Sequence, residues 1–176
     1  VFPKGLNDPV TAGPLQLAWC PDSGLLQLKQ SYDLTEMYGD NYGYRSGLNA
    51  SMVAHLQTKA KEIQRFRSLS AGDVVVDVGS NDATFLKSYD APGVQRVGID
   101  PTGHKFRRFY GEDIKLIPDF FSADMFRSQC GDIKASILTS IAMFYDLEDP
   151  TAFVRDIASI LADDGIWHFE QSYMPS

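Results

Sequence analysis

A short segment of the sequence, GDVVVDVGSNDATFL (residues 72–86), joins an apolar run to side chains that can bind a ligand. The small and polar residues at and after the end of the run are Asp77, Gly79, Ser80, Asn81 and Asp82. Loops that bind a pyrophosphate need several glycines, so that bare backbone N–H groups can approach the phosphates. Here Gly79 is the single glycine after the run, and the carboxylate of Asp82 would repel a diphosphate. The pattern therefore favours a ligand that has no phosphate and carries positive charge.

S-adenosylmethionine is such a ligand, because it carries a sulfonium and an ammonium group. The carboxylates of Asp77 and Asp82 would lower the electrostatic energy of these cations in a partly dry cleft. Asp100 ends the segment RVGID about twenty residues after Gly79, where a carboxylate commonly accepts hydrogen bonds from ribose hydroxyls. The alternative is that an aspartate at the end of a strand only helps to form a turn. The loop at Gly79, followed by Asp100 at this spacing, favours a cofactor that contains a nucleoside.

The elements that position these residues alternate along the chain after Asp73. Apolar runs predict strands at Val74–Val78, Arg96–Ile99, Ile114–Ile117, Ile133–Thr139 and Gly165–Glu170. Helices are expected near Ala83–Tyr89, Gly103–Tyr110, Ser122–Gln129 and Pro150–Ile160, the last with Asp149 as its N-cap. Strands that are apolar at nearly every position suit a parallel sheet covered on both faces. The alternation predicts an α/β fold with a doubly wound, Rossmann-like, mostly parallel sheet.

The first seventy residues have a different pattern. Two apolar segments flank a turn at Pro21–Gly24 and predict a β-hairpin. The tyrosine-rich stretch Tyr32–Ser46 is expected to be irregular, and an amphipathic helix is expected over Asn49–Phe66. We therefore expect a small β unit (1–30), a tyrosine-rich segment with a linking helix (31–70), and a cofactor-binding Rossmann-like domain (71–176).

Composition narrows the class of protein. The 176 residues are 44% hydrophobic and 22% charged, which is ordinary for a soluble globular protein. The formal net charge of -7 argues against a nucleic-acid partner, since phosphate backbones attract clustered Lys and Arg. No apolar run approaches the length of a membrane span, so no membrane partner is expected. Cys20 and Cys130 are too few for a disulfide framework, so a cytoplasmic location is expected.

Five segments of the chain together resemble the class I S-adenosylmethionine-dependent methyltransferases. They are VVVDVGSNDATFL, VGIDPTG, IPDFFSADMF, ILTSIAMFYDLEDPTAFVRDI and LADDGIWHFEQSYM. More narrowly, they look like the sugar C-methyltransferase family, which methylates nucleotide-linked deoxyketosugars. That family usually has Ser-Asn-Asp-Gly in the loop, whereas this chain has Ala83 at the last of the four positions.

The resemblance implies that different loops hold different parts of the cofactor. The methionine end would be lined by Gly79, Ser80 and Asn81. The ribose and adenine would be bound by Asp100, Pro101, Asp119 and Phe120, with Asp100 on the ribose. The sulfonium would lie above Ser140 and Ile141. Plain core packing is the alternative for Phe120 and for its neighbour Phe121.

The segment YGDNYGYRSGLN (residues 38–49) resembles the family's Tyr-x-Tyr-x-Ser segment, which folds over the cofactor and carries an active-site tyrosine. Tyr44 is the first choice for that catalytic tyrosine and Tyr42 is the second. Such a tyrosine would polarise the substrate or position the base. The alternative is a lid aromatic that only packs. His55, on the helix that follows, is assigned a structural role.

The segment WCPDSGLLQL (residues 19–28) resembles half of the family's zinc-binding unit. Cys20 stands at the first cysteine of a Cys-x-x-Cys pair, Ser23 stands at the second, and the upstream pair is absent. Structural zinc needs four nitrogen or sulfur ligands, so no metal is expected.

The family's Glu-His base pair lies beyond the fifth strand, after Ser176 of this sequence. We therefore expect mainly the cofactor-binding half of a methyltransferase, with a small-molecule substrate such as a nucleotide-sugar. Two alternatives are the same fold with another small-molecule acceptor and a non-catalytic S-adenosylmethionine-binding or interaction domain. A nicotinamide dehydrogenase is a third and is disfavoured by the glycine-poor loop. An open sheet edge at Gly165–Glu170 would favour self-association.

Overall fold

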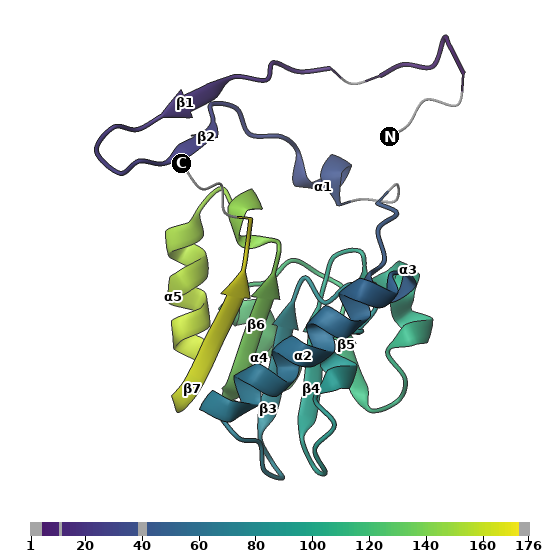
Figure 1. The fold of residues 1–176 in the computed structure, drawn as a ribbon, viewed down its shortest axis with the longest axis vertical. Helices are drawn as coiled ribbons and strands as arrows, with labels where there is room; N and C mark the ends of the chain where they lie inside the picture. The colour runs from purple at the N-terminus through teal and green to yellow at the C-terminus, as the bar shows by residue number, and fades with distance from the viewer. Residues whose placement is uncertain (1–4, 11, 39–41, 173–176) are drawn as a thin grey trace. The chain divides into compact units, whose positions relative to one another are not determined.

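The computed structural model describes residues 5–10, 12–38 and 42–172 (Figure 1). The chain forms two compact units, Val1–Gly43 and Tyr44–Ser176. The first contains a small hairpin and the second contains the main sheet. The division into three segments that the sequence suggests stays a prediction.

The first unit contains the predicted β-hairpin. Strands β1 (Leu17–Trp19) and β2 (Leu26–Leu28) pair antiparallel. The turn between them includes Gly24, whose φ of 71° lies in the left-handed region that favours glycine. A short helix, α1 (Leu34–Met37), follows, and the Asp33 side chain caps it by accepting a hydrogen bond from the Thr35 N–H.

The second unit is built on a five-stranded sheet with the order β5-β4-β3-β6-β7. Its strands are β3 (Val74–Val78), β4 (Gln95–Ile99), β5 (Ile114–Ile117), β6 (Ala135–Ile141) and β7 (Leu161–Glu170). All neighbouring strands are parallel. The chain winds outward from β3 through β4 to β5 and then returns to the other side of β3 for β6 and β7. The predicted doubly wound α/β fold is therefore confirmed.

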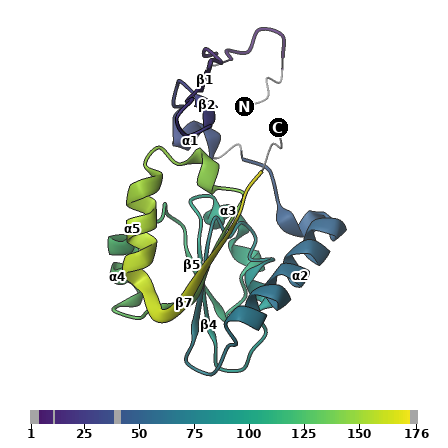
Figure 2. The same ribbon diagram turned by 60° about the vertical axis from the view of Figure 1, so that its left-hand side comes forward.

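Helices cover both faces of the sheet (Figure 2). The longer ones are α2 (Ala50–Phe66), α4 (Ala123–Cys130) and α5 (Pro150–Ile160), and α3 (Gly103–Phe106) is a single turn. Short 3-10 turns occur at η1 (Ser46–Leu48), η2 (Leu86–Ser88), η3 (Arg107–Phe109) and η4 (Phe144–Asp146). Helix α5 begins as its sequence predicts, because the Asp149 side chain accepts a hydrogen bond from the Ala152 N–H and Pro150 needs no N–H partner there. No helix among the described residues is long and apolar enough to cross a membrane.

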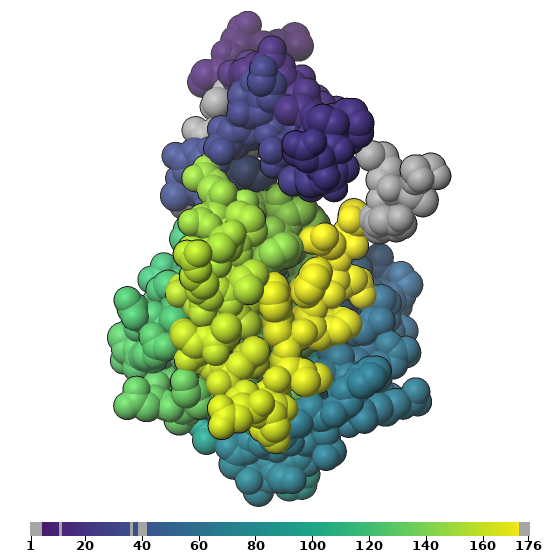
Figure 3. All heavy atoms as spheres, turned by 90° about the vertical axis from the view of Figure 1, so that its left-hand side faces the viewer, coloured from purple at the N-terminus to yellow at the C-terminus, as the bar shows by residue number. Residues whose placement is uncertain are grey.

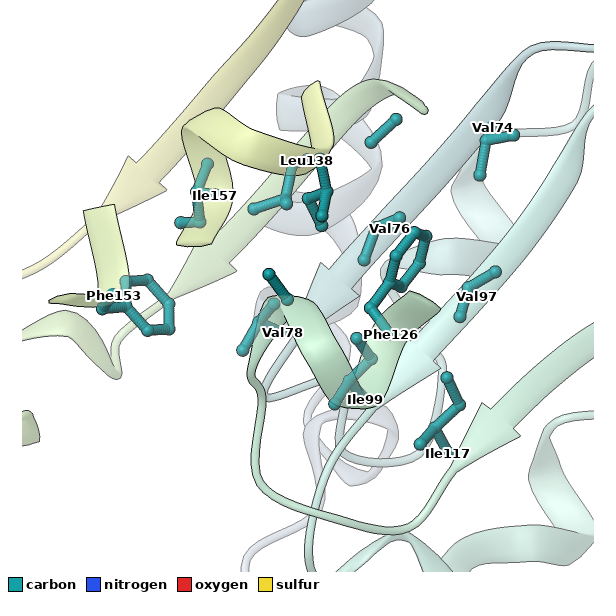
Figure 4. Packing of buried hydrophobic residues seen from close by; sticks show 13 residues of the cluster. Val74, Val76, Val78, Val97, Ile99, Ile117, Phe126, Leu138, Phe153 and Ile157 are labelled. Carbon is teal, nitrogen blue, oxygen red and sulfur yellow. The ribbon is translucent and has the colours of Figure 1, made fainter. Parts of the chain in front are cut away.

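Alternate residues of the central strand point into two separate hydrophobic clusters. Val74, Val76 and Val78 face α4 and α5, where Phe126 and Ile157 are fully buried (Figure 4). The opposite face of the strand, represented by Val75, packs toward α2. Burial on both faces is why this strand is apolar at nearly every position.

One predicted helix is largely missing. The sequence predicts a helix near Ala83–Tyr89, but the structure has only the 3-10 turn η2 in this stretch. Ala83 has a φ of 62°, which a right-handed helix cannot contain. The Asp82 side chain also accepts from the Thr84 N–H, a local bond that competes with helix formation. Helix α2 covers this face of the sheet instead, through Leu56, Ala60 and Ile63.

Strand β7 lies at one edge of the sheet within the described part of the chain. It begins at Leu161, directly after α5, and so is longer than the predicted Gly165–Glu170. Figure 3 shows β7 in yellow at the surface, between α5 and α2. Phe169 is 43% exposed and Trp167 is only partly buried. Among the described residues, these two aromatic side chains of β7 therefore have incomplete cover.

We expect this edge to cause self-association, because unpaired backbone groups and apolar side chains favour strand pairing between copies. Sedimentation should show concentration-dependent dimers or larger species in spite of the net charge of -7. Phe169→Lys should shift the distribution toward monomer, whereas Val154→Lys on the exposed face of α5 should not. A monomer at all concentrations would contradict the prediction.

One face of α5 is buried and the other is exposed, so truncating a side chain to alanine should lower stability on the buried face only. Ile157 is 1% exposed, so Ile157→Ala should lower the free energy of unfolding by about 2–5 kcal/mol through lost contacts and a cavity. Val154 on the same helix is 39% exposed, and Val154→Ala should change that free energy by less than about 0.5 kcal/mol. Urea unfolding at equilibrium measures both, and equal effects would rule out this packing.

Candidate functional site

The candidate site lies at the carboxyl ends of the strands, where β3 separates the two halves of the doubly wound sheet. The loop after β3 turns sharply because alternate residues adopt the left-handed conformation. Their φ angles are 79° at Gly79, 50° at Asn81 and 62° at Ala83. Asparagine tolerates this region, but alanine loses about 1–2 kcal/mol there. Glycine adopts a left-handed φ without this strain. The φ of Ala83 therefore explains why the family that this sequence resembles usually has glycine at this position.

Asp100 joins the end of β4 to this loop. One carboxylate oxygen accepts a hydrogen bond from the Asn81 N–H at 2.8 Å. The other accepts from the N–H of Thr102 at 2.7 Å and from its hydroxyl at 2.6 Å. The carboxylate is 6% exposed, and these three bonds compensate its burial. Asp100 therefore fixes the loop, whatever ligand it also contacts.

Tyr110 holds the same loop from the opposite side. Its hydroxyl donates to the Asn81 carbonyl at 2.8 Å, and the Ser80 hydroxyl therefore donates to the Tyr110 oxygen at 2.7 Å. Burial raises the pKa of Tyr110 well above its usual value, so its hydroxyl remains a neutral donor. Ser80 is buried and points its side chain at Tyr110. Its contribution to a ligand is restricted to the backbone.

Asp77 is a buried acid within the central strand. Its carboxyl group accepts a hydrogen bond from the Thr139 hydroxyl of β6 at 2.6 Å. Burial raises the pKa of Asp77 to about 7, the Thr139 hydrogen bond opposes that rise, and the nearby Asp100 charge adds to it. Near neutral pH, Asp77 is thus present in both protonated and ionised forms.

The segment that precedes α2 is bonded directly to the loop after β3. The Ser46 N–H donates to the Asn81 side chain at 3.0 Å, and the Asn81 amide donates to the Tyr44 carbonyl at 3.1 Å. The Gly47 N–H donates to Asp82 at 3.0 Å. A side chain on Gly47 would lie 2.6 Å from the Asp82 carboxylate, so glycine permits this close approach.

Asp82 is neutralised within the chain itself. Its carboxylate pairs with the Arg45 guanidinium at 3.2 Å and accepts a hydrogen bond from the Thr84 hydroxyl. The Arg45 guanidinium also stacks 4.3 Å from the Phe109 ring centre. The sequence predicts that Asp82 stabilises a bound cation, and this stays a prediction. In the structure the Asp82 carboxylate holds the loop through Arg45, Gly47 and Thr84.

The remaining predicted cofactor residues follow β4, β5 and β6. Pro101 is partly buried next to Asp100. Asp119 accepts from the Phe120 N–H, and Phe120 is 42% exposed, so core packing does not describe Phe120. Its neighbour Phe121 does pack in the core, 5.3 Å from the Phe153 ring centre.

The two predicted residues of β6 have different environments. The Ser140 side chain is fully buried, and its hydroxyl accepts from the Trp167 indole N–H at 3.0 Å. It can therefore offer a ligand only its backbone. Ile141 is half-buried at the end of the strand, and Ala142 follows it with a φ of 52°.

The two candidate tyrosines belong to different units. Tyr44 lies beside the loop through its carbonyl, and its side chain is 48% exposed. Tyr42 belongs to the first unit, where its ring lies 5.4 Å from that of Tyr38. Cys20 is also in that unit, and hydrogen bonds from Ser23 lower the pKa of its thiol. Across the described ranges, no group of three or more His, Cys, Asp and Glu side chains could hold a metal ion.

No sequence pattern singles out Arg45, Tyr110 or Thr139. Thr139 becomes visible only when β6 pairs with β3 and places it opposite Asp77. Tyr110 reaches the loop from a turn 30 residues away. Arg45 stands inside the tyrosine-rich segment. Its positive charge is the only property in the sequence that fits pairing with an acidic residue of the loop.

Comparisons with known proteins agree with the fold. The sequence matches no protein-family model. It is 23% identical over 167 residues to the C-methyltransferase NovU of Streptomyces niveus, which covers 93% of this chain. The chain spans 39% of the length of that relative.

Two solved structures have a similar fold. The first is CalS10 with S-adenosylmethionine bound, an amino pentose methyltransferase from Micromonospora echinaspora involved in calicheamicin biosynthesis. It has a TM-score of 0.55 and 17% identity, over 77% of this chain and 60% of that one. The second is the plantazolicin methyltransferase BpumL in complex with a triazolic desmethylPZN analogue and S-adenosylhomocysteine. It has a TM-score of 0.55 and 14% identity, over 71% of this chain and 49% of that one. The fold of this chain is that of the class I S-adenosylmethionine-dependent methyltransferases.

Proposed function

We propose that this chain is the cofactor-binding half of an S-adenosylmethionine-dependent methyltransferase, acting on carbon of a nucleotide-linked deoxyketosugar. The observation that carries the proposal is the loop after β3. It is fixed by Asp100, bordered by the buried acid Asp77, and contains a single glycine. This arrangement suits a nucleoside whose other end is cationic rather than a diphosphate.

The residues proposed to bind the cofactor lie along one edge of the sheet. A carboxylate offers about four lone-pair sites, and Asp100 uses three, which leaves one for a ribose hydroxyl. The exposed ring of Phe120 and the partly buried Pro101 are proposed to border the adenine. Gly79, whose backbone is exposed, and Ile141 are proposed to border the methionine and the sulfonium.

The proposed acceptor rests on the printed names of the relatives. NovU is a C-methyltransferase and CalS10 is an amino pentose methyltransferase, and both names support an acceptor that contains a sugar. Tyr44 is proposed to polarise the acceptor, since its side chain is exposed beside the loop, and Tyr42 is the second choice. A cytoplasmic location is proposed from the small number of cysteines.

Titration calorimetry with S-adenosylhomocysteine and, separately, with NAD tests the choice of cofactor. We expect heat of binding with the first and none with the second. Asp100→Ala should weaken S-adenosylhomocysteine binding by about 1–3 kcal/mol, because hydrogen bonds to the ribose and to the loop are both lost. The matched control is Asp163→Asn at the opposite end of the sheet, where affinity should be unchanged. Equal affinities of Asp100→Ala and the parent would refute the ribose assignment.

The raised pKa of Asp77 predicts how stability depends on pH. The folded-state pKa of about 7 lies above the ordinary value of about 3.9, so the folded protein binds more protons than the unfolded chain between these pH values. The protonated form therefore stabilises the fold at low pH, and this contribution is lost as pH rises through 7.

Asp77→Asn should remove that loss, since an amide keeps an acceptor for Thr139 and does not ionise. The unfolding free energy of the parent minus that of the variant should fall by a few kcal/mol between pH 5 and pH 8. Urea unfolding of both proteins at the two pH values measures the difference. A difference that does not change with pH would show that Asp77 does not titrate in this range.

A further inference from the structure

The β-hairpin formed by β1 and β2 (Figure 1) has one apolar face. Residues that stand directly opposite each other in an antiparallel pair point to the same side of the hairpin. Leu17 stands opposite Leu28, and Trp19 stands opposite Leu26. Because side chains two positions apart in a strand also share a side, all of these side chains lie together. We call this group the hairpin face.

The hairpin face is exposed. Leu17 and Trp19 are 63% and 64% exposed, and Leu26 and Leu28 are 42% and 41% exposed. On the other side of the hairpin, the middle of β2 carries the polar Gln27. Single exposed apolar residues are common on proteins, whereas a contiguous group of them usually marks a surface that binds another protein.

A hairpin of this length needs support from outside itself. Each strand has three residues, and a two-stranded hairpin is at best marginally stable in water on its own. Its residues do not supply a metal site instead, since the described ranges hold no group of three or more His, Cys, Asp and Glu side chains that could bind an ion. Burial of the hairpin face against another surface would provide the missing stabilisation.

The shape of the hairpin face suits a second copy of itself. The end near the turn carries Trp19 and is bulky, and the other end carries Leu17 and Leu28. Two copies related by a two-fold axis and packed antiparallel would place each Trp19 against the two smaller leucines of the other copy. Large side chains then meet smaller ones, as in a well-packed core. Packing in the same direction would instead set one Trp19 upon the other.

Charge favours the same arrangement. The hairpin face contains no charged residue, so its burial leaves no charge without a partner. Asp22 lies in the turn, and Lys29 directly follows β2 at the opposite end of the hairpin. Antiparallel packing brings Asp22 of one copy to the end that carries Lys29 of the other. Packing in the same direction would bring like charges together, which is unfavourable.

We propose that the hairpin face is a dimerisation surface on which a second copy of this chain packs antiparallel. The proposal depends neither on the proposed function nor on the edge strand β7. The face is small beside the roughly 20–30 residues a side of a standard interface, so the dimer is weak and forms at high protein concentration. Dimerisation and stability of the hairpin are coupled, because the second copy binds only the folded hairpin.

Phe169→Lys provides the background for the test, because it removes the self-association expected at β7. Sedimentation of this variant should still show a concentration-dependent dimer. Adding Trp19→Lys should raise the dissociation constant of the dimer by at least about tenfold, since a buried tryptophan commonly contributes that much to an interface. The control is Gln27→Lys, which adds the same charge on the opposite side of the hairpin and should leave the constant unchanged.

Exchange of the end charges tests the orientation. In the same background, Asp22→Lys brings two positive charges together and should raise the dissociation constant by about two- to fivefold. Lys29→Asp brings two negative charges together and should have a similar effect. The double variant again pairs opposite charges and should return the constant to that of the background. A double variant at least as weak as either single one would overturn the antiparallel arrangement.

Hydrogen exchange tests the proposal without a change to the hairpin face. The Cys20 N–H donates to the Leu25 carbonyl, and the Lys29 N–H donates to the Gln16 carbonyl, both at 2.9 Å. Both amides should exchange more slowly as the concentration of the Phe169→Lys protein rises, because dimerisation stabilises the hairpin. The same amides identify a variant whose hairpin has unfolded.

Three results would each overturn the proposal. The first is a Phe169→Lys protein that stays monomeric at all concentrations. The second is exchange of the two hairpin amides at a rate that does not depend on concentration. The third is equal weakening of the dimer by Trp19→Lys and Gln27→Lys, which would show that added charge, and not loss of the hairpin face, is responsible.

Discussion

The pairing of β3 with a parallel strand on each side is the constraint on which the rest of the second unit depends. Parallel pairing with β4 and β6 brings the carboxyl ends of all five strands to one edge of the sheet. The chain leaves β3 toward β4, and the later strand β6 returns to its other side. The loop after β3 therefore stands at the junction of the two halves, and residues from distant parts of the sequence must converge on it.

The loop is stabilised chiefly by polar bonds from outside itself. Asp100 binds the Asn81 N–H, Tyr110 binds the Asn81 carbonyl, and Arg45 pairs with Asp82. These contacts hold a loop backbone in which Ala83 has a strained left-handed φ. No helix forms next to Ala83 to offset that strain. Strained backbone that surrounding contacts maintain is typical of ligand-binding sites. Polar contacts from other segments therefore hold the loop in this strained conformation.

The replacement of a helix after β3 by α2 links distant parts of the chain. With only a 3-10 turn in the stretch after the loop, the face of the sheet next to β3 is covered by α2, which precedes the sheet in the chain. This helix also reaches β7 and carries His55 to Glu170. Cover of the hydrophobic face and the contact between His55 and Glu170 thus result from one packing arrangement. The η1 turn, just before α2, fixes the start of the helix through Gly47 and Asp82.

The sequence by itself determined the elements whose signals are local. Val74–Val78 reads as a doubly buried strand because every position is apolar except Asp77, and α5 is marked by Asp149 and Pro150. The order of these elements is enough for the doubly wound fold, and the glycine-poor loop is enough to disfavour a diphosphate.

The tertiary structure alone decided which polar groups are free and which are committed. Asp82 is paired with Arg45, and the Ser140 hydroxyl accepts a hydrogen bond from Trp167. His55 meets Glu170 only through packing of α2 on β7. These facts depend on side-chain directions and on pairs far apart in the chain, which neither the period nor the spacing of a sequence contains.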